Sequence, residues 1–396
     1  MTKPVILTGL RANNALHIGN YFGAMLPMVE MATQRSDDYQ VNMFIPDLHS
    51  FTTPIDHSQL LGQTINNARL YAAAGLPLDN ESILLYRQSY VPAHSELTWI
   101  LDCFTGFGEL GRMTQFKEKS SVNSGPETER QIAAQLQSIG EVVLEPTHPG
   151  SKYRPDILLK TADGNTVVIE VKRNRSEGPS VGLYNYPVLM ASDILLYGAQ
   201  YVPVGDDQTQ HLEYTRDIAE RMNKKFGDIL TIPEEVSKQH EFFGKGQGLR
   251  IKDLVDPTKK MSKSDESGKG VIFLTDAPED AAKKVMSATT DDKASVNYDP
   301  VSQPGISNLL QILALLRGVP IDEVEAEFKG NERYGDFKKV VADEVATFLT
   351  KFQTKLADVD DAAINAAFER SEQIANIQAN ATLYRVQQAV GLRPRG

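Results

Sequence analysis

The sequence predicts an α/β fold made of a parallel-sheet domain, an α-helical C-terminal domain and a small α+β insertion. Three observations support this prediction. Strand-like and helix-like stretches alternate over the first third of the chain, which is typical of parallel strands joined by helical crossovers. Helical spacing dominates after about Val301, and a polar, loop-rich stretch interrupts the first pattern at 121–180. The 396 residues are enough for two or three domains.

The N-terminal elements are predicted from short apolar runs. We expect buried strands at Val5–Thr8, Val41–Ile45 and Ile83–Tyr86, with one helix after Leu16 and another over Ser58–Ala74. Parallel sheets bind ligands at the carboxyl ends of their strands. A ligand site is therefore expected in the loops that follow these three strands.

The C-terminal part shows apolar residues at spacings of three and four. These residues are Leu309, Ile312, Leu313 and Leu316, and then Phe348, Phe352 and Leu356. Such spacing predicts amphipathic helices that share a core. We therefore expect a catalytic domain formed by 1–120 and 181–290, an insertion at 121–180, and a helical domain at 291–396.

Composition narrows the classes of protein. The net charge of −11 argues weakly against nucleic acid as a partner, although basic residues gather at 117–119, 259–263, 338–339 and 393–395. Cys103 is the only cysteine, so an intramolecular disulfide is excluded and a thiolate zinc or iron–sulfur site is disfavoured. The sequence shows neither a signal peptide nor a run of about 18 apolar residues. We expect a cytoplasmic protein.

The first candidate motif is Leu16-His17-Ile18-Gly19-Asn20, directly after the first strand. A helix that begins here presents unpaired N–H groups and a partial positive charge, so it can bind an anion. Gly19 would let a nucleotide approach the backbone, and His17 and Asn20 would add donors for charge that develops on a phosphate. The alternative is a partly exposed histidine on a surface helix.

The second candidate motif is Lys260-Met261-Ser262-Lys263-Ser264, in a polar stretch. Two lysines three residues apart, with small hydroxyl residues beside them, suit a loop that neutralises a leaving pyrophosphate. The alternative is a solvated basic loop. The order and distance of the two motifs along the chain favour the phosphate site.

Together the two motifs resemble the signatures of class I aminoacyl-tRNA synthetases, and three longer stretches resemble the bacterial tryptophanyl-tRNA synthetases. These stretches are Gly108–Ser120, Tyr186–Tyr197 and Val202–Glu213, and the resemblance covers the chain except for 121–180. It implies a Rossmann-like catalytic domain, a helical domain that recognises the tRNA anticodon region, and a homodimer. It also implies that tryptophan is activated with ATP and Mg²⁺ and transferred to tRNA(Trp).

The resemblance also implies roles for individual residues. Asp193 would accept the indole N–H, and Met190, Gln115 and His49 would line the ring pocket. The implied catalytic residues are His17, Asn20, Lys119, Lys260 and Lys263, with the three lysines holding the β- and γ-phosphates. The implied ATP-binding residues are Arg11, Ala12, Asn13, Gly19, Asn20, Gly205, Asp206, Asp207, Ile251, Lys260, Met261, Ser262, Lys263 and Ser264. Mg²⁺ would be carried by ATP and would need no ligand from the protein.

One segment departs from the family pattern. The family usually shows Gln-Pro-Ser/Thr-Gly where this chain has Arg11-Ala12-Asn13-Asn14. Asn14 would take the left-handed turn that glycine normally supplies. Arg11 would add a positive charge close to where the nucleotide and the amino acid meet.

In the insertion we expect a helix at about 127–139 and strands near Val142–Leu144, Tyr153–Lys160 and Thr166–Lys172. The insertion also carries Pro155-Asp156 and Glu170-Val171-Lys172, which resemble the metal site of the nuclease superfamily named for its Pro-Asp and Asp/Glu-x-Lys residues. A two-residue turn at Asp163-Gly164 would pair Asp156 with Val171, whereas a three-residue loop would pair it with Glu170 and align the candidate site, Asp156, Glu170 and Lys172. The favoured interpretation is a decorative or interface module, because the later helix and strand of such nucleases have no counterpart here.

Two other functions compete with tryptophan activation. A tyrosine enzyme of the same architecture is one, although Met190 and the 208–213 stretch disfavour it. The other is a nucleic-acid-processing or regulatory protein that keeps the synthetase fold without its activity, which Lys260 and Lys263 disfavour.

Overall fold

The computed structural model describes residues 3–9, 16–52, 55–114, 116–117, 140–144, 157–161, 166–169, 180–205, 208–243, 251–262 and 268–394. Three parallel strands form the central sheet in the order β1 (Val5–Gly9), β2 (Gln40–Ile45) and β3 (Ile83–Arg87). A bridge between Ile6 and Tyr201 extends the sheet beyond β1. The predicted strands and their parallel pairing are confirmed.

The two faces of the sheet support two hydrophobic cores. Ile6, Met43 and Leu85 belong to one core, whereas their neighbours Leu7 and Phe44 belong to the other. This alternation follows from the two-residue period of side chains along a strand. The first core continues into the C-terminal helices, and the second lies under α5 (Ala93–Asp102), α9 (Val181–Leu196) and α10 (Thr209–Phe226).

The helix predicted after Leu16 is present in three continuous parts: α1 (Ile18–Asn20), a π-helix (Tyr21–Met25) and α2 (Leu26–Arg35). One face of this helix is buried, since Ile18, Phe22, Met25 and Val29 are all buried. Pro27 lies in the first turn of α2, directly after the π-helix. There the Leu26 N–H donates to the Tyr21 carbonyl five residues back, so a wide turn precedes the proline.

Four more short or medium helices are described between residues 47 and 110. They are α3 (Asp47–Ser50), α4 (Leu60–Ala73), the 3₁₀-helix η2 (Gln88–Tyr90) and α6 (Phe107–Leu110). Both α3 and η2 begin within two residues of the end of a parallel strand. Their side chains therefore lie at the carboxyl edge of the sheet, where the sequence places the ligand site.

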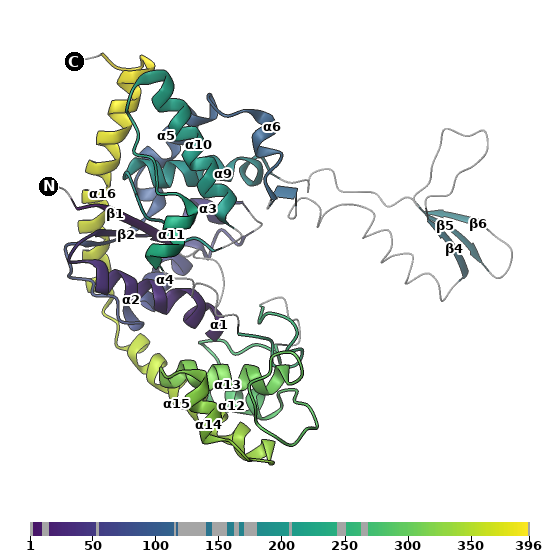
Figure 1. Ribbon diagram of the computed structural model, residues 1–396. Coiled ribbons are helices and arrows are strands. Elements are labelled where there is room, and N and C mark those ends of the chain that lie inside the picture. Colours follow the sequence, from purple (N-terminus) through teal and green to yellow (C-terminus); the bar gives the residue numbers. More distant parts are fainter. Residues whose placement is uncertain are drawn as a thin grey trace.

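The second half is helical, as predicted. After α11 (Val236–Phe243) come α12 (Pro278–Met286), α13 (Pro304–Arg317), α14 (Ile321–Glu327), α15 (Tyr334–Ala357) and α16 (Asp361–Val390). The predicted apolar positions Leu309, Ile312, Leu313 and Phe352 are buried. Figure 1 shows α12–α15 as a lower lobe, while α16 runs upward along the sheet domain.

Helix α16 covers the open edge of the central sheet. The Ser371 hydroxyl accepts a hydrogen bond from the Leu85 N–H at 3.1 Å, and the Glu372 carboxylate accepts one from the Arg87 N–H at 3.3 Å. Unpaired N–H groups on an edge strand favour pairing with other chains. The last helix thus completes β3 with side chains instead of a further strand.

The described part of the insertion is an antiparallel sheet of β4 (Gly140–Leu144), β5 (Ile157–Thr161) and β6 (Thr166–Ile169). All three strands were predicted, and Figure 1 shows them away from the two lobes. Ile157 pairs with Ile169, which is the register expected of the three-residue connection. The predicted helix at 127–139 and the residues Asp156, Glu170 and Lys172 lie outside the described residues.

Within the described stretches, no single helix has both the length and the apolar character to cross a membrane. Only α13 and α14 taken together, bent by 110° at their break, pass that test on length and composition.

Candidate active site

The first motif forms a helix N-terminus, as predicted. His17 caps α1: its Nδ1 accepts a hydrogen bond from the Asn20 N–H at 3.2 Å, and the Asn20 Oδ1 accepts one from the His17 N–H at 3.3 Å. Because Nδ1 is an acceptor, a neutral His17 ring carries its proton on Nε2. His17 is buried, so the alternative of a partly exposed surface histidine is wrong.

The space above Gly19 is occupied by protein in this structure. A Cβ on Gly19 would lie 2.9 Å from both Cε1 and Nδ1 of His17, and 3.7 Å from the Cβ of Ile251. Glycine is therefore required by the histidine ring that packs against it. Ile251 lies beside the second motif, so Gly19 is the point where the two motifs meet.

Each motif is paired with a short extended segment. The Ile18 N–H donates to the Ile272 carbonyl at 3.0 Å, and the Leu274 N–H donates to the Leu16 carbonyl at 2.9 Å. In the second motif, the Met261 N–H donates to the Ile251 carbonyl at 3.0 Å. The structure thus holds the two motifs together through segments 251–253 and 272–274.

The described part of the second motif is anchored by one buried side chain. Met261 is buried between exposed neighbours, Lys260 and Ser262, and Lys260 forms a β-bridge with Lys252. The next lysine upstream, Lys259, pairs with Asp256 at 2.9 Å, whereas Lys260 pairs with none of the acids in the described ranges. Within the described part of the second motif, the Lys260 ammonium is thus exposed and forms no ion pair.

Hydrogen bonds close the turn before Lys260. Asp256 accepts from the Thr258 hydroxyl at 2.5 Å and from Lys259. These hydrogen bonds, first from Thr258 and then from Lys259, lower the pKa of Asp256 to about 2. Asp256 thus stays ionised at neutral pH and engages Lys259.

Two amide side chains of the C-terminal helices hold the paired segments. Asn308 of α13 accepts from the Lys252 N–H at 2.8 Å and donates to the Lys252 carbonyl at 3.0 Å. Gln353 of α15 donates to the carbonyls of Leu274 and Asp276 at 2.9 and 2.8 Å. The helical lobe therefore contributes to the position of both motifs.

The predicted tryptophan-binding acid lies at the centre of a buried polar cluster. Asp193 of α9 is 1% exposed and accepts hydrogen bonds from His49 at 2.8 Å, from His94 at 2.6 Å and from Gln88 at 2.7 Å. Burial acts to raise the pKa of Asp193, but the hydrogen bonds from His49 and His94 outweigh it and the pKa is lowered. The acid is charged and held from three elements.

Sequence reasoning missed Gln88 and His94. Gln88 directly follows β3, so the strand-end rule that favoured the loop after Tyr86 could have indicated it. His94 lies six residues further on, in the first turn of α5, and its contact with Asp193 depends on tertiary packing.

The other predicted residues have varied positions. Met190 is partly buried against the second core, and the Gly205 carbonyl accepts from the Gln208 N–H at 2.8 Å. His211 contacts the Tyr186 hydroxyl at 2.8 Å, in line with a structural histidine. The remaining candidates lie outside the described residues: Arg11, Ala12, Asn13, Gln115, Lys119, Asp206, Asp207, Lys263 and Ser264.

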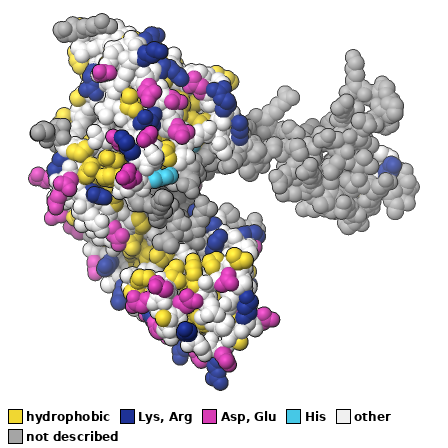
Figure 2. All heavy atoms as spheres, in the orientation of Figure 1, with side chains coloured by type: hydrophobic (Ala, Val, Ile, Leu, Met, Phe, Trp, Pro, Cys, Tyr) yellow, Lys and Arg dark blue, Asp and Glu magenta, His cyan; other side chains and the backbone are white. Residues whose placement is uncertain are grey.

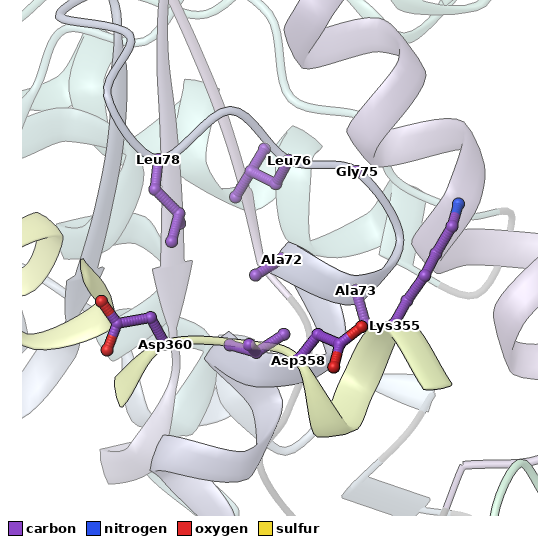
Figure 3. Close-up of a pocket in the computed structure, with 9 residues that line it drawn as sticks. Ala72, Ala73, Gly75, Leu76, Leu78, Lys355, Asp358 and Asp360 are labelled. Atoms are coloured by element: carbon purple, nitrogen blue, oxygen red, sulfur yellow. The ribbon is translucent and has the colours of Figure 1, made fainter. Parts of the chain in front are cut away.

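A cavity of about 520 Å³ lies away from this site. Figure 3 shows it between the end of α4 and the turn from α15 to α16, with Leu76 and Leu78 on one side and Lys355 and Asp358 on the other. It contains no residue that the sequence assigns to a substrate. We therefore place the candidate site at the carboxyl edge of the sheet and not in this cavity.

A parallel sheet with a capped helix N-terminus at its carboxyl edge, next to a lysine loop, defines a nucleotide-binding enzyme of the synthetase type. The chain belongs to the class I tRNA synthetases (W and Y), whose family model matches residues 2–145 and 164–350. The stretch between the two matched parts, 146–163, falls inside the predicted insertion, and 351–396 lies beyond the match.

Individual relatives are similar over nearly the whole chain. A tryptophan–tRNA ligase of Caldanaerobacter subterraneus subsp. tengcongensis is 38% identical over 98% of both chains. Among solved structures, tryptophanyl-tRNA synthetase from Mycoplasma pneumoniae has a TM-score of 0.71 at 31% identity over 99% of both chains. The enzyme from Campylobacter jejuni, complexed with ADP and tryptophan, has a TM-score of 0.69 at 25% identity, and the match covers 98% of this chain and 99% of that one.

Proposed function

We propose that this chain is a tryptophan–tRNA ligase, which activates tryptophan with ATP and transfers it to tRNA(Trp). The observation that carries the proposal is the buried Asp193 carboxylate at the carboxyl edge of the sheet, in a chain so similar to a tryptophan–tRNA ligase. An ionised carboxylate accepts the indole N–H, and a substrate without that donor leaves it unpaired. Met190 and His49, with Gln115, are the proposed walls of the ring pocket.

The proposed reaction needs no nucleophile from the protein. A carboxylate oxygen of tryptophan bonds to the α-phosphorus of ATP, and the bond to pyrophosphate breaks. A ribose hydroxyl of the tRNA then attacks the carbonyl carbon, and AMP leaves. Catalysis consists mainly of positioning and charge stabilisation.

We assign the phosphate groups to the two motifs. The Nε2–H of His17, the α1 N-terminus and the Asn20 amide are donors for the α-phosphate. Lys260, together with Lys263 and Lys119, neutralises the negative charge of the departing pyrophosphate. Mg²⁺ bound to the triphosphate would neutralise part of this charge; the described ranges hold no group of three acidic, histidine or cysteine side chains that could bind it alone.

Pyrophosphate exchange assayed with single amino acids tests the function. We expect exchange with tryptophan and not with tyrosine, and we expect Lys260→Ala to lower its rate by about 10²-fold or more because pyrophosphate charge is left unpaired. Lys259→Ala is the matched control, since Lys259 is engaged by Asp256. Its exchange should stay close to that of the unchanged chain.

Each other outcome supports a different function. Exchange with tyrosine alone would establish the tyrosine enzyme, and exchange with neither would support a regulatory or nucleic-acid-processing protein. Charging of tRNA(Trp) with labelled tryptophan would complete the assignment. We also propose a cytoplasmic location, because the tRNA substrate is used there.

We further propose a homodimer. Its support is a set of exposed apolar side chains on α5, α6 and α9: Trp99, Phe107 and Val181, with exposed fractions of 71, 82 and 82%. Helix α9 packs against both α5 and α6, and exposed apolar side chains on neighbouring helices mark interaction surfaces. Figure 2 shows acidic and basic side chains interspersed on the face drawn.

Sedimentation velocity tests the dimer. At micromolar concentration we expect the mass of two chains. For Phe107→Asp we expect the mass to shift towards that of one chain, because the new charge would have to be desolvated at an apolar contact. Leu61→Asp is the control, since Leu61 is 58% exposed on α4, apart from this surface. A single-chain mass for the unchanged protein would overturn the proposal.

A further inference from the structure

The hydrogen-bond donors around Asp193 use most of the acceptor positions of its carboxylate. A carboxylate offers about four acceptor positions and no donor. Three are used: Gln88 and His94 both donate to Oδ1, and His49 donates to Oδ2. About one acceptor position therefore remains for a ligand.

Gln88 is oriented by the backbone. The Leu48 N–H donates to the Gln88 Oε1 at 3.2 Å, so the amide nitrogen points towards Asp193. An N–H group can only donate, which fixes which end of the amide faces it. Gln88 thus presents a donor, and no acceptor, to the carboxylate.

His94 is fixed at both ring nitrogens. Nδ1 donates to Asp193 at 2.6 Å, and Nε2 lies 2.9 Å from the Tyr197 hydroxyl. Burial raises the pKa of Tyr197, so its hydroxyl keeps its proton and donates to Nε2. This donation holds a neutral His94 in the tautomer whose Nδ1 carries the proton.

The surroundings of His94 prevent another orientation. Its side chain is fully buried, and its ring lies 6.3 Å from that of Phe44 and 5.6 Å from that of Tyr197, measured between centroids. Rotation would remove hydrogen bonds at both ends of the imidazole, which is costly in a buried site. The Tyr197, His94 and Asp193 side chains form one rigid chain.

We propose that His94 is a positioning residue that determines specificity. Together with Gln88 it donates to Asp193, and one acceptor position of the carboxylate is left for a ligand group that can only donate a hydrogen bond. This inference rests on the proposed function and deepens it. An indole N–H donates and accepts nothing, so it matches the position. A phenol hydroxyl also carries acceptor lone pairs, and among the described residues the Gln88 and His94 donors are already taken by Asp193, so these lone pairs are left unsatisfied by them.

Two variants of similar size test the role of His94. His94→Asn places an amide donor near the position of Nδ1, and His94→Gln places one near Nε2, towards Tyr197. The readout is kcat/KM in pyrophosphate exchange for tryptophan, divided by that for 3-benzothienylalanine, in which sulfur replaces the indole N–H. A structural defect alone lowers both values and leaves the ratio unchanged.

We expect His94→Gln to lower this ratio by about tenfold or more, mainly through the KM for tryptophan, whereas His94→Asn stays within about threefold of the unchanged chain. The KM for ATP should be the same in all three. Equal ratios in the two variants, or a ratio unchanged in His94→Gln, would overturn the inference. If the unchanged chain did not exchange with tryptophan, the proposed function itself would fail, which is a separate result.

Tyr197→Phe provides a second measurement if His94→Gln does not fold. It leaves His94 in place and removes the hydroxyl that selects its tautomer. A fall in the same ratio would support the inference. An unchanged ratio would show that the orientation of His94 does not govern selection.

Discussion

Replacing Glu372 with alanine is expected to lower the free energy of unfolding by about 3–5 kcal/mol, because it leaves the Arg87 guanidinium buried without its partner. Glu372 accepts from Arg87 Nε at 2.6 Å and from Nη2 at 2.9 Å. The two side chains are only 13 and 10% exposed. Arg87 also lies 3.4 Å above the Tyr90 ring, so the cation is enclosed on several sides.

The same carboxylate joins α16 to the sheet. It accepts from the Arg87 N–H at the edge of β3, so the substitution also leaves an edge-strand donor without its bond. Burial acts to lower the pKa of Arg87, but the Glu372 hydrogen bond outweighs it and the pKa is raised. Without Glu372 the guanidinium still stays charged, because arginine is too basic to lose its proton in a protein, so its desolvation is uncompensated.

Urea denaturation followed by circular dichroism measures this effect. Asp280→Ala is the matched control: it removes an ion pair of 2.8 Å with Lys283, whose side chains are 77 and 63% exposed, and should cost less than about 1 kcal/mol. Replacing Arg87 and Glu372 together with leucine should cost less than Glu372→Ala, because no charge is left unpaired. A Glu372→Ala loss as small as that of the control would contradict the role given to this pair.

Gly19→Ala is expected to lower the rate of tryptophan activation on the order of 10²-fold, because the new methyl group displaces the His17 ring. The added Cβ would lie 2.9 Å from two atoms of that ring. The ring also caps α1 through Asn20, so its displacement breaks the cap and moves both proposed α-phosphate donors. Binding of tryptophan, which we assign to Asp193, should change little.

Pyrophosphate exchange at saturating tryptophan, together with a tryptophan-binding isotherm, separates the two effects. Gly62→Ala is the control: Gly62 lies inside α4 with no atom within 4 Å of an added Cβ, and the change should raise stability by about 0.4–1 kcal/mol without loss of activity. Exchange by Gly19→Ala within threefold of the unchanged chain would show that the His17 ring can move without consequence.

Much of the fold is predictable from local pattern. The strands β1, β2 and β3 follow from short apolar runs, and the helix after Leu16 and the helices after Val301 follow from apolar spacings of three and four. These spacings reflect the geometry of neighbouring residues, which any window of the sequence contains. The two candidate motifs, 16–20 and 260–264, are recognisable for the same reason, since each is a short contiguous stretch.

The partners of Asp193 show what local pattern leaves open. The sequence identified Asp193 and His49, but the carboxylate is held equally by His94 and Gln88, which lie 99 and 105 residues away along the chain. Two buried residues meet only when strands and helices pack, and many histidines and glutamines in a sequence could satisfy one acid. The selection is made by packing, which excludes all but the groups that fit.

By itself, therefore, the sequence determined the class of fold, the apolar faces of its elements and the two motifs to which we assign the phosphate chemistry, because these depend on short-range periodicity and contiguous residues. The tertiary structure alone decided that α16 completes the edge of β3, that Asn308 and Gln353 hold both motifs, and that His94 faces Asp193. Each of these contacts joins residues more than 50 positions apart, and its free energy depends on long-range burial that no local window contains.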